Sequence, residues 1–155
     1  MTVPELRALL SLLVLVVAGC TSTPQANSEQ DALAKQFGTE RGSATLYVYR
    51  PGDFDNHVED LATALYVDRQ AIGSIMAGMY FVVHLAPGSH TLSGIATDQG
   101  RMTLQVQAGQ LYFVSLGITD GNSVYTRVSP ERGKREVSEC CTLYDNFHPG
   151  RRPVF

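Results

Sequence analysis

Short segments in which apolar and polar residues alternate make up most of the chain from Ser43 onward. The clearest is RMTLQVQA at residues 101–108, in which every second side chain is apolar. Alternation with a period of two is typical of a β-strand that has one buried and one solvated face. Eight strands are predicted on this basis, at residues 44–50, 64–68, 71–76, 79–85, 90–97, 101–108, 111–118 and 124–129.

The spacing of these segments predicts the fold class. They recur about every ten residues and are separated by turn residues, without a helix long enough for a parallel crossover. We therefore expect an all-β domain over residues 43–129, an antiparallel sandwich-like structure of about seven or eight short strands.

A short helix is predicted ahead of the strands. Ser28 is followed three positions later by Asp31, which is a variant of the capping box. Leu33 and Phe37 lie four residues apart on one helical face, and Gly38 is placed to end the helix. The expected helix of about nine residues either docks on the domain or has no partner.

A second helix is predicted after the strands, in the segment 130–155. Ser129 is a suitable N-cap, and Pro130 suits the first helical position. The apolar residues that follow have the spacing of one helical face: Val137, Cys140, Cys141 and Tyr144. The residues from Asp145 to Phe155 are expected to form a tail.

The N-terminal segment is strongly apolar. Residues 9–19 read LLSLLVLVVAG, which is short for a membrane span of about 20 residues and typical of a signal-peptide core. The run ends in Val17-Ala18-Gly19-Cys20, which resembles a bacterial lipobox. That resemblance implies a signal peptide at 1–19, lipid on Cys20 and a linker at 20–42. The alternatives are an ordinary signal peptide and a buried helix that ends in cysteine.

Composition and charge exclude two classes of protein. The chain has 155 residues, of which 17% are charged and 8% are aromatic, and its formal net charge is −3. This length suits one ordinary domain. The small negative charge provides no basic surface for nucleic acid, and the aromatic content is too high for a disordered chain.

Five local features occur in order behind the cysteine. They are Tyr47–Gly52 (YVYRPG), Tyr66–Asp68 with Ile72 and Gly73, Gly78–Phe81 (GMYF), Pro87–Leu92 (PGSHTL) and Ala108–Phe113 (AGQLYF). Together they resemble a bacterial lipoprotein family known as domain of unknown function 2846. The middle features are also similar to the small PEGA-type β module. The resemblance implies a surface-anchored β domain and supplies no catalytic residue.

Metal-ligand patterns are weak in this sequence. The four histidines, at positions 57, 84, 90 and 148, form no dense ligand motif, and His90 follows a turn, where a solvated side chain is expected. Oxygen ligands for Ca²⁺ crowd one loop: Asp53, Asp55, Asn56, Glu59 and Asp60. The calcium-loop pattern is not met, so a solvated acidic loop is the preferred interpretation. We expect no metal and no cofactor.

Cys140 and Cys141 are adjacent, which is unusual for a disulfide. Consecutive Cα atoms lie about 3.8 Å apart, below the usual range for a disulfide of about 4.4–6.8 Å. We therefore expect two buried thiols on a helix face, or one thiol paired with another chain. An activated catalytic thiolate would need a base, and the sequence identifies none.

These observations predict a non-enzymatic lipoprotein of the bacterial envelope that binds a protein or another envelope component. Its partner is expected at the long loop after Pro51, through Asp53, Phe54, Asp55, Glu59 and Asp60. The alternative is a small-ligand or carbohydrate-binding module that uses the loop 51–63. Thr21 replaces the aspartate that marks inner-membrane retention in enteric-type sorting, so we expect the outer membrane, on its periplasmic side.

Overall fold

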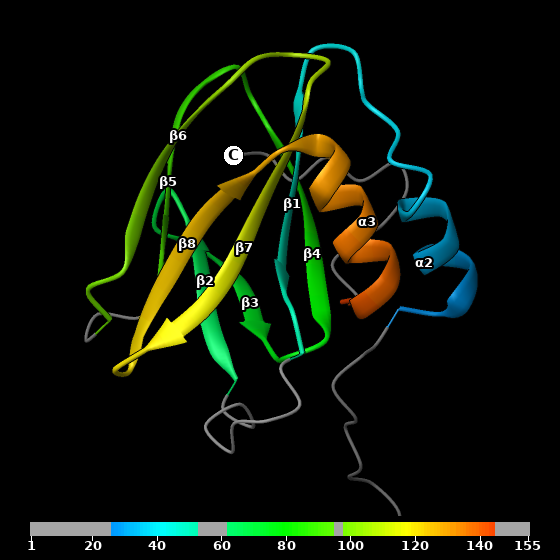
Figure 1. Ribbon diagram of the computed structural model, residues 1–155. Helices are drawn as coiled ribbons and strands as arrows, with labels where there is room; N and C mark the ends of the chain where they lie inside the picture. The colour runs from blue at the N-terminus through cyan, green and yellow to red at the C-terminus, as the bar shows by residue number, and fades with distance from the viewer. Residues whose placement is uncertain (1–25, 53–61, 95–97, 145–155) are drawn as a thin grey trace, which may run out of the picture.

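The structure is a computed structural model that describes residues 26–52, 62–94 and 98–144 (Figure 1). Its helices are α2 (Ser28–Ala34) and α3 (Pro130–Cys140). Its strands are β1 (Ala44–Arg50), β2 (Thr63–Val67), β3 (Gln70–Ile75), β4 (Met79–Leu85), β5 (Gly88–Ser93), β6 (Arg101–Val106), β7 (Leu111–Thr119), β8 (Asn122–Val128) and β9 (Thr142–Leu143). Neither helix is long and apolar enough to span a membrane within these described ranges.

The strands form two sheets that face each other. One sheet has the order β8-β7-β1-β4-β9, and the other has the order β3-β2-β5-β6. Most neighbouring strands are antiparallel, whereas β1 with β7 and β4 with β9 are parallel. The prediction of an all-β sandwich is therefore confirmed, and the two parallel pairs are an addition to it.

The space between the sheets is filled by an inter-sheet core of mostly aliphatic side chains. Its buried members are Ala44, Leu46, Val48, Leu65, Val67, Ile75, Phe81, Val83, Leu85, Leu92, Leu104, Val106, Tyr112, Val114, Leu116, Tyr125 and Tyr144. These side chains come from alternate positions of both sheets, as period-two alternation requires. Burial of this apolar surface is the main force that holds the two sheets together.

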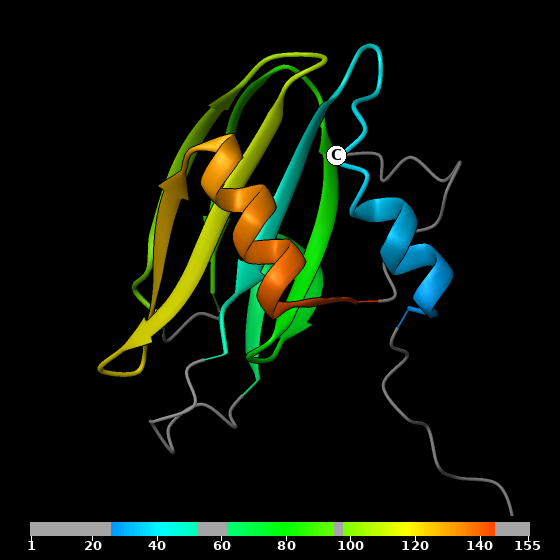
Figure 2. The same ribbon diagram turned by 45° about the vertical axis from the view of Figure 1, so that its right-hand side comes forward.

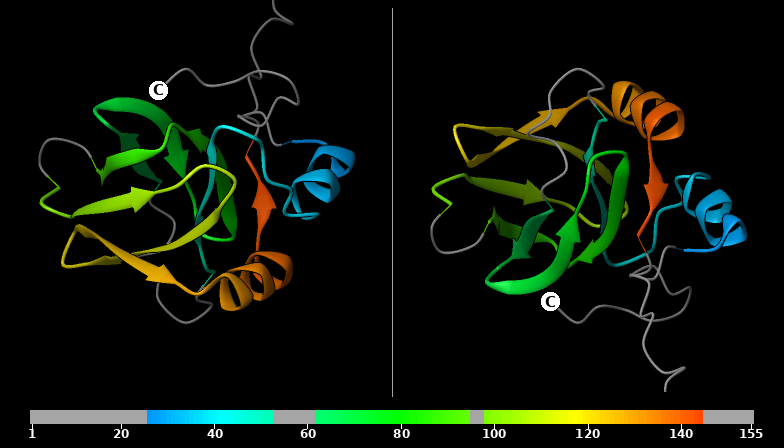
Figure 3. Two further views of the ribbon diagram at one scale, coloured as in Figure 1. Left: turned by 90° about the horizontal axis from the view of Figure 1, so that it is seen from above. Right: turned by 90° about the horizontal axis from the view of Figure 1, so that it is seen from below.

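The other face of the five-stranded sheet is covered by α2 and α3 (Figures 2 and 3). An outer-layer core lies between the helices and this face. Its buried members are Ala26, Ala34, Tyr47, Tyr49, Tyr80, Val82, Phe113, Val128, Val137, Cys141 and Leu143. Because β1 is covered on both sides, all seven of its residues are buried.

The N-cap of helix α2 lies one residue before the predicted cap, Ser28, and the helix ends earlier than expected. Asn27 caps it, since its side chain accepts a hydrogen bond from the Gln30 backbone and the Gln30 side chain accepts one from the Asn27 backbone. Lys35 is the C-cap, so the prediction of Gly38 as the end of the helix is wrong. Phe37 has a φ of 53°, and its ring packs 5.3 Å from Tyr47, which draws the chain out of the helix.

Helix α3 starts as predicted, with Ser129 as N-cap and Pro130 in the first turn. It ends at Cys140, and Cys141 has extended backbone angles (φ −131°, ψ 149°). The prediction that Cys141 and Tyr144 continue the helical face is therefore wrong. The chain leaves the helix because its backbone pairs with β4: Thr142 donates to Gly78, and Tyr144 donates to Tyr80, both at 2.9 Å.

Candidate functional site

The residues predicted from sequence to carry the function lie outside the described ranges. They are Cys20 and the loop residues Asp53, Phe54, Asp55, Glu59 and Asp60. The ends of the loop are described: it leaves β1 in the five-stranded sheet after Arg50 and reaches β2 in the four-stranded sheet at Thr63. The loop therefore connects the two sheets at one end of the sandwich (Figure 1).

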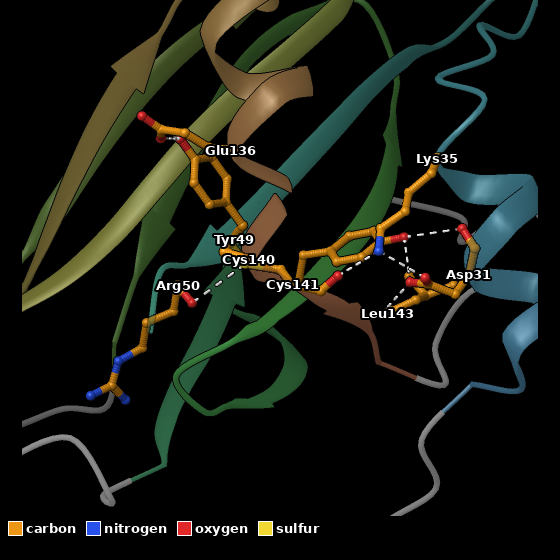
Figure 4. Close-up of a disulfide and its surroundings, with 9 residues drawn as sticks. Asp31, Lys35, Tyr49, Arg50, Glu136, Cys140, Cys141 and Leu143 are labelled. Carbon is orange, nitrogen blue, oxygen red and sulfur yellow. Dashed lines mark hydrogen bonds and ion pairs between the residues drawn. A yellow bond between two sulfur atoms is a disulfide. The ribbon is translucent and has the colours of Figure 1, made fainter. Parts of the chain in front are cut away.

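The base of this loop meets two other segments at one corner of the molecule. The Arg50 carbonyl accepts a hydrogen bond of 2.8 Å from the Gly78 backbone, in the turn before β4. The same carbonyl oxygen lies 3.7 Å from the sulfur of Cys141, at the end of α3. We refer to Arg50, Gly78, Cys140 and Cys141 as the disulfide corner. Figure 4 labels Arg50 and the two cysteines.

Cys140 and Cys141 form a disulfide, with their Cα atoms 3.7 Å apart. The prediction of two separate thiols is wrong. It rested on the short Cα–Cα distance of adjacent residues, which the structure keeps while the disulfide still forms, and on a helical face that continues through Cys141. The helix ends between these two residues instead, because β9 pairs with β4, and the change from helical to extended backbone allows the sulfurs to meet.

Asp31 connects α2 to the sheet beside the disulfide corner. Its Oδ1 accepts hydrogen bonds from the Tyr80 hydroxyl at 2.9 Å and from the Leu143 backbone at 2.8 Å. Its Oδ2 pairs with the Lys35 ammonium at 2.8 Å. Lys35 also donates to the Cys141 carbonyl at 2.7 Å, so α2 is bound to the segment that follows the disulfide (Figure 4).

A second polar tie holds α3 to β1. The Tyr49 hydroxyl donates to Glu136, and Arg132 pairs with the same carboxylate. Burial by itself would raise the pKa of Glu136, but the hydrogen bonds from Tyr49 and Arg132 outweigh it and hold that pKa below its usual value. Burial and the hydrogen bond to Glu136 raise the pKa of Tyr49, so its hydroxyl remains a proton donor.

His90 lies on β5 in the four-stranded sheet and is buried, with 7% of its surface exposed. The prediction of a solvated histidine is wrong. Its Nδ1 lies 2.5 Å from Asp68, and its Nε2 lies 2.8 Å from the Ala86 carbonyl. Asp68 also accepts a hydrogen bond from the Thr91 backbone, so it ties the β2–β3 turn to β5. Burial opposes ionisation of Asp68, but the Thr91 and His90 hydrogen bonds lower its pKa.

Asp98 is a buried carboxylate that connects the two sheets. Its Oδ1 accepts backbone hydrogen bonds from Gly100 at 2.7 Å and from Ser123 at 2.9 Å, and the Ser123 hydroxyl donates to its Oδ2. Burial would raise the pKa of Asp98, but these three bonds lower it. Asp98 precedes β6 and Ser123 lies on β8, so this single side chain joins edge strands of different sheets.

Asp31, Asp68, Asp98 and Glu136 thus serve as ties between elements. The described part of the chain contains no cluster of three His, Cys, Asp or Glu side chains that could hold a metal ion. Sequence reasoning gave Asp31 a role only in a capping box and gave none to Asp98 or Glu136, because the strand residues that they tie, Tyr80, Ser123 and Tyr49, are distant in sequence. An Asp-x-Gly pattern at Asp98 was the one local signal, since such an aspartate favours a bond to its own backbone two residues on.

The comparisons with known proteins agree with the motifs in the sequence. The family model described as "Protein of unknown function (DUF2846)" matches residues 40–130, which is more than half of the chain. A protein of Haemophilus influenzae that carries the name "Uncharacterized protein" is 28% identical over 140 residues, covering 86% of this chain and 81% of that protein. No solved structure matches. The predicted resemblance is therefore confirmed: the chain belongs to the DUF2846 family.

Proposed function

We propose that this protein is a membrane-anchored lipoprotein of the bacterial envelope that acts by binding a protein or another envelope component rather than by catalysis. In this proposal lipid is attached at Cys20, and the domain faces the periplasm from the outer membrane. The lipobox-like segment before Cys20 and the polar residues after it support the anchor. Several acyl chains on one residue would anchor it stably, at about 0.8 kcal/mol for each buried CH₂.

The attachment of α2 is the observation that carries the proposal. The described chain begins at Ala26, whose backbone donates to the Leu143 carbonyl at 3.3 Å, and α2 follows at once. Six residue steps separate Cys20 from Ala26, and they span at most about 20 Å. A lipid on Cys20 would therefore hold the helix-covered side of the sandwich close to the membrane surface, in a limited range of orientations.

The polar ties support a binding role. The hydrogen-bonded carboxylates of Asp31 and Asp98 each join separate structural elements, which makes the scaffold rigid. Rigid β scaffolds commonly present binding surfaces on their long loops. The loop after Pro51 leaves from the disulfide corner, where Arg50, Gly78 and Cys141 are held together. Its acidic side chains and Phe54 would provide charge for orientation and apolar surface for affinity.

The anchor is tested with Cys20→Ser in the full chain. We expect the variant to leave the membrane fraction and to lose detergent partitioning, because it removes the thiol that would accept lipid. Cys140→Ser is the matched control, since it also replaces one cysteine with serine but leaves Cys20 in place. Membrane fractionation of Cys20→Ser that equals the wild type would contradict the anchor.

The binding loop is tested by replacing residues 53–60 with a Gly/Ser linker of equal length. We expect an unchanged melting temperature and the loss of partners crosslinked in native membranes. A charge-only variant, in which Asp53, Asp55 and Asp60 become Asn and Glu59 becomes Gln, separates charge from chain length. Unchanged crosslinked partners in both variants would place the binding surface elsewhere on the domain.

A further inference from the structure

The two cysteines of the disulfide corner have different surroundings. Cys140 is half-buried at the last position of α3, whereas Cys141 is 4% exposed in the extended segment that follows. In thiol–disulfide exchange, an external thiolate attacks the sulfur that it can reach, and the other sulfur leaves. The geometry therefore assigns Cys140 as the attacked sulfur and Cys141 as the leaving one.

The fold also accommodates the reduced pair. The Cys141 sulfur lies 3.7 Å from the Arg50 carbonyl oxygen, which is within reach of a hydrogen bond from a thiol. In the disulfide this sulfur carries no proton to donate, and the carbonyl accepts the Gly78 backbone hydrogen bond of 2.8 Å. After reduction, the new Cys141 thiol has this carbonyl beside it as an acceptor, so it can remain buried with its proton hydrogen-bonded.

The residues after the disulfide hold the N-terminal segment of the domain. Lys35 donates to the Cys141 carbonyl, Asp31 accepts from the Leu143 backbone, and Ala26 donates to the Leu143 carbonyl. The covalent link between Cys140 and Cys141 restricts the backbone at the junction from which this segment extends. Opening the link removes that restriction.

We propose that the Cys140–Cys141 disulfide is a thiol–disulfide exchange site whose reducing partner is a protein dithiol, and that its redox state sets how firmly α2 is held. The first thiolate of the dithiol bonds to Cys140 and breaks the disulfide, and Cys141 leaves as a thiolate that takes up a proton. The second thiol of the dithiol then attacks the mixed disulfide and releases Cys140. Two electrons and two protons pass from the dithiol to the cysteine pair.

The exchange is tested on the purified, folded full chain with dithiothreitol as the probe dithiol. N-ethylmaleimide labelling is followed by peptide mapping, which reports Cys140 and Cys141 separately from Cys20. We expect no label at positions 140 and 141 before reduction; after reduction we expect a label at Cys140 without denaturant and at the buried Cys141 only with denaturant. Labelling of either position before reduction, or labelling of Cys140 that requires denaturant, would overturn the exchange site.

The link to α2 is tested by amide hydrogen exchange. The Lys35 amide, which donates to the Asp31 carbonyl at 3.0 Å, reports on α2, and the β1 amides serve as an internal reference. We expect reduction to speed exchange at Lys35 on the order of tenfold and to leave β1 unchanged.

The double variant Cys140→Ser/Cys141→Ser is the matched control for that experiment. It is expected to exchange like the reduced wild type and to show no response to dithiothreitol. Equal exchange of the Lys35 amide in the oxidised and reduced wild type would overturn the proposal that the redox state sets how firmly α2 is held. A response of the double variant to dithiothreitol would overturn it as well. Because the wild type is measured in both redox states, the test stands even where the variant fails to fold. It requires no lipid, so it is independent of the proposed anchor.

Discussion

The two hydrophobic cores on opposite faces of the five-stranded sheet are built from different side chains. The inter-sheet core is mostly Leu, Val and Ile, and it joins one sheet to the other. Its tyrosines, Tyr112, Tyr125 and Tyr144, keep 8–9% of their surface exposed, whereas those of the outer layer keep at most 2%. The outer-layer core contains Tyr47, Tyr49 and Tyr80, and it joins the sheet to two short helices. The hydroxyls of these three tyrosines donate to Ala34, Glu136 and Asp31, respectively.

This difference shows how each interface is specified. Backbone pairing fixes the strands within each sheet, and close packing of side chains then positions one sheet on the other. Aliphatic side chains are sufficient for that packing. A helix of seven or eleven residues has little stability of its own and many ways to lie on a flat sheet. Buried hydroxyls that each have one acceptor limit the orientations that the helix can adopt, because a buried hydroxyl left without its partner costs free energy. The family match at residues 40–130 spans the sandwich strands β1–β8 and leaves out α2 and β9.

The largest effect is expected where α3 approaches the sheet most closely. A Cβ at Gly133 would lie 2.2 Å from the Phe113 ring, so Gly133→Ala forces the helix or the ring to move. We expect a loss of about 3 kcal/mol in the free energy of unfolding, measured with urea, although alanine favours the helix itself. Gly117→Ala is the control, since nothing lies within 4 Å of its added Cβ. A stabilised Gly133→Ala variant would contradict this packing.

The two cores can be compared directly with one substitution. Val114 lies in the inter-sheet core and Val137 in the outer-layer core, and both are fully buried. We expect Val114→Ala to lower the free energy of unfolding by about 2.5 kcal/mol and Val137→Ala by about 1.5 kcal/mol. Alanine suits a helix better than valine and suits a strand less well, which separates the two values. Equal losses in urea unfolding would mean that helix propensity does not distinguish the layers.

Asp98 makes the inter-sheet region sensitive to acid. Its pKa is lowered in the folded state, so its contribution is present above the unfolded value of about 3.9 and is lost as pH falls through the folded value. We expect Asp98→Asn to cost about 2 kcal/mol at pH 7, and this difference from the wild type should shrink below about pH 4.

Stability curves against pH, measured by urea unfolding, test this expectation. Asp68→Asn is the matched control, because Asp68 also has a lowered pKa but ties a turn to β5 within one sheet. A difference between Asp98→Asn and the wild type that stays constant from pH 7 to pH 3 would rule out the ionised carboxylate as the tie.

The smallest effect is expected from one hydroxyl of the outer layer. Tyr80→Phe removes the hydrogen bond to Asp31 and keeps the ring, so we expect a loss of about 1 kcal/mol in the free energy of unfolding. Amide exchange in α2 should rise by more than exchange in β1. The control is Tyr66→Phe at a half-buried position of β2 in the other sheet, where we expect no measurable change. Equal losses in the two variants would show that the hydroxyl does not position α2.

Predictions from sequence were most accurate where the deciding contacts are local. The bounds of β1 and β4 were predicted to the residue, because apolar segments between turn residues define a strand without reference to its partner. The N-terminal cap of α3 was also predicted, since Ser129 bonds to Arg132 three residues away. The turn after β2 was predicted one residue too late in the chain: its residues are Asp68 and Arg69, both at positive φ.

Predictions failed where the partner is distant along the chain. His90 was expected in solvent, but Asp68, 22 residues earlier, buries and binds it. The end of α3 was missed because it depends on the unpaired edge of β4, to which the following residues add as β9. The disulfide followed from that ending, since Cys140 and Cys141 meet only where the helix gives way to a strand.

The sequence by itself determined the class of fold, the positions of most strands and the family of the chain, because period-two alternation and turn residues act over a few neighbouring positions. The tertiary structure alone decided how the helices are held and which polar groups are buried. Asp31 illustrates the reason: it is an ordinary acidic residue of a short helix until β4 brings Tyr80 and β9 brings Leu143 within 3 Å of its carboxylate. Contacts of this kind join residues about 50 and more than 100 positions apart, and no local pattern encodes them.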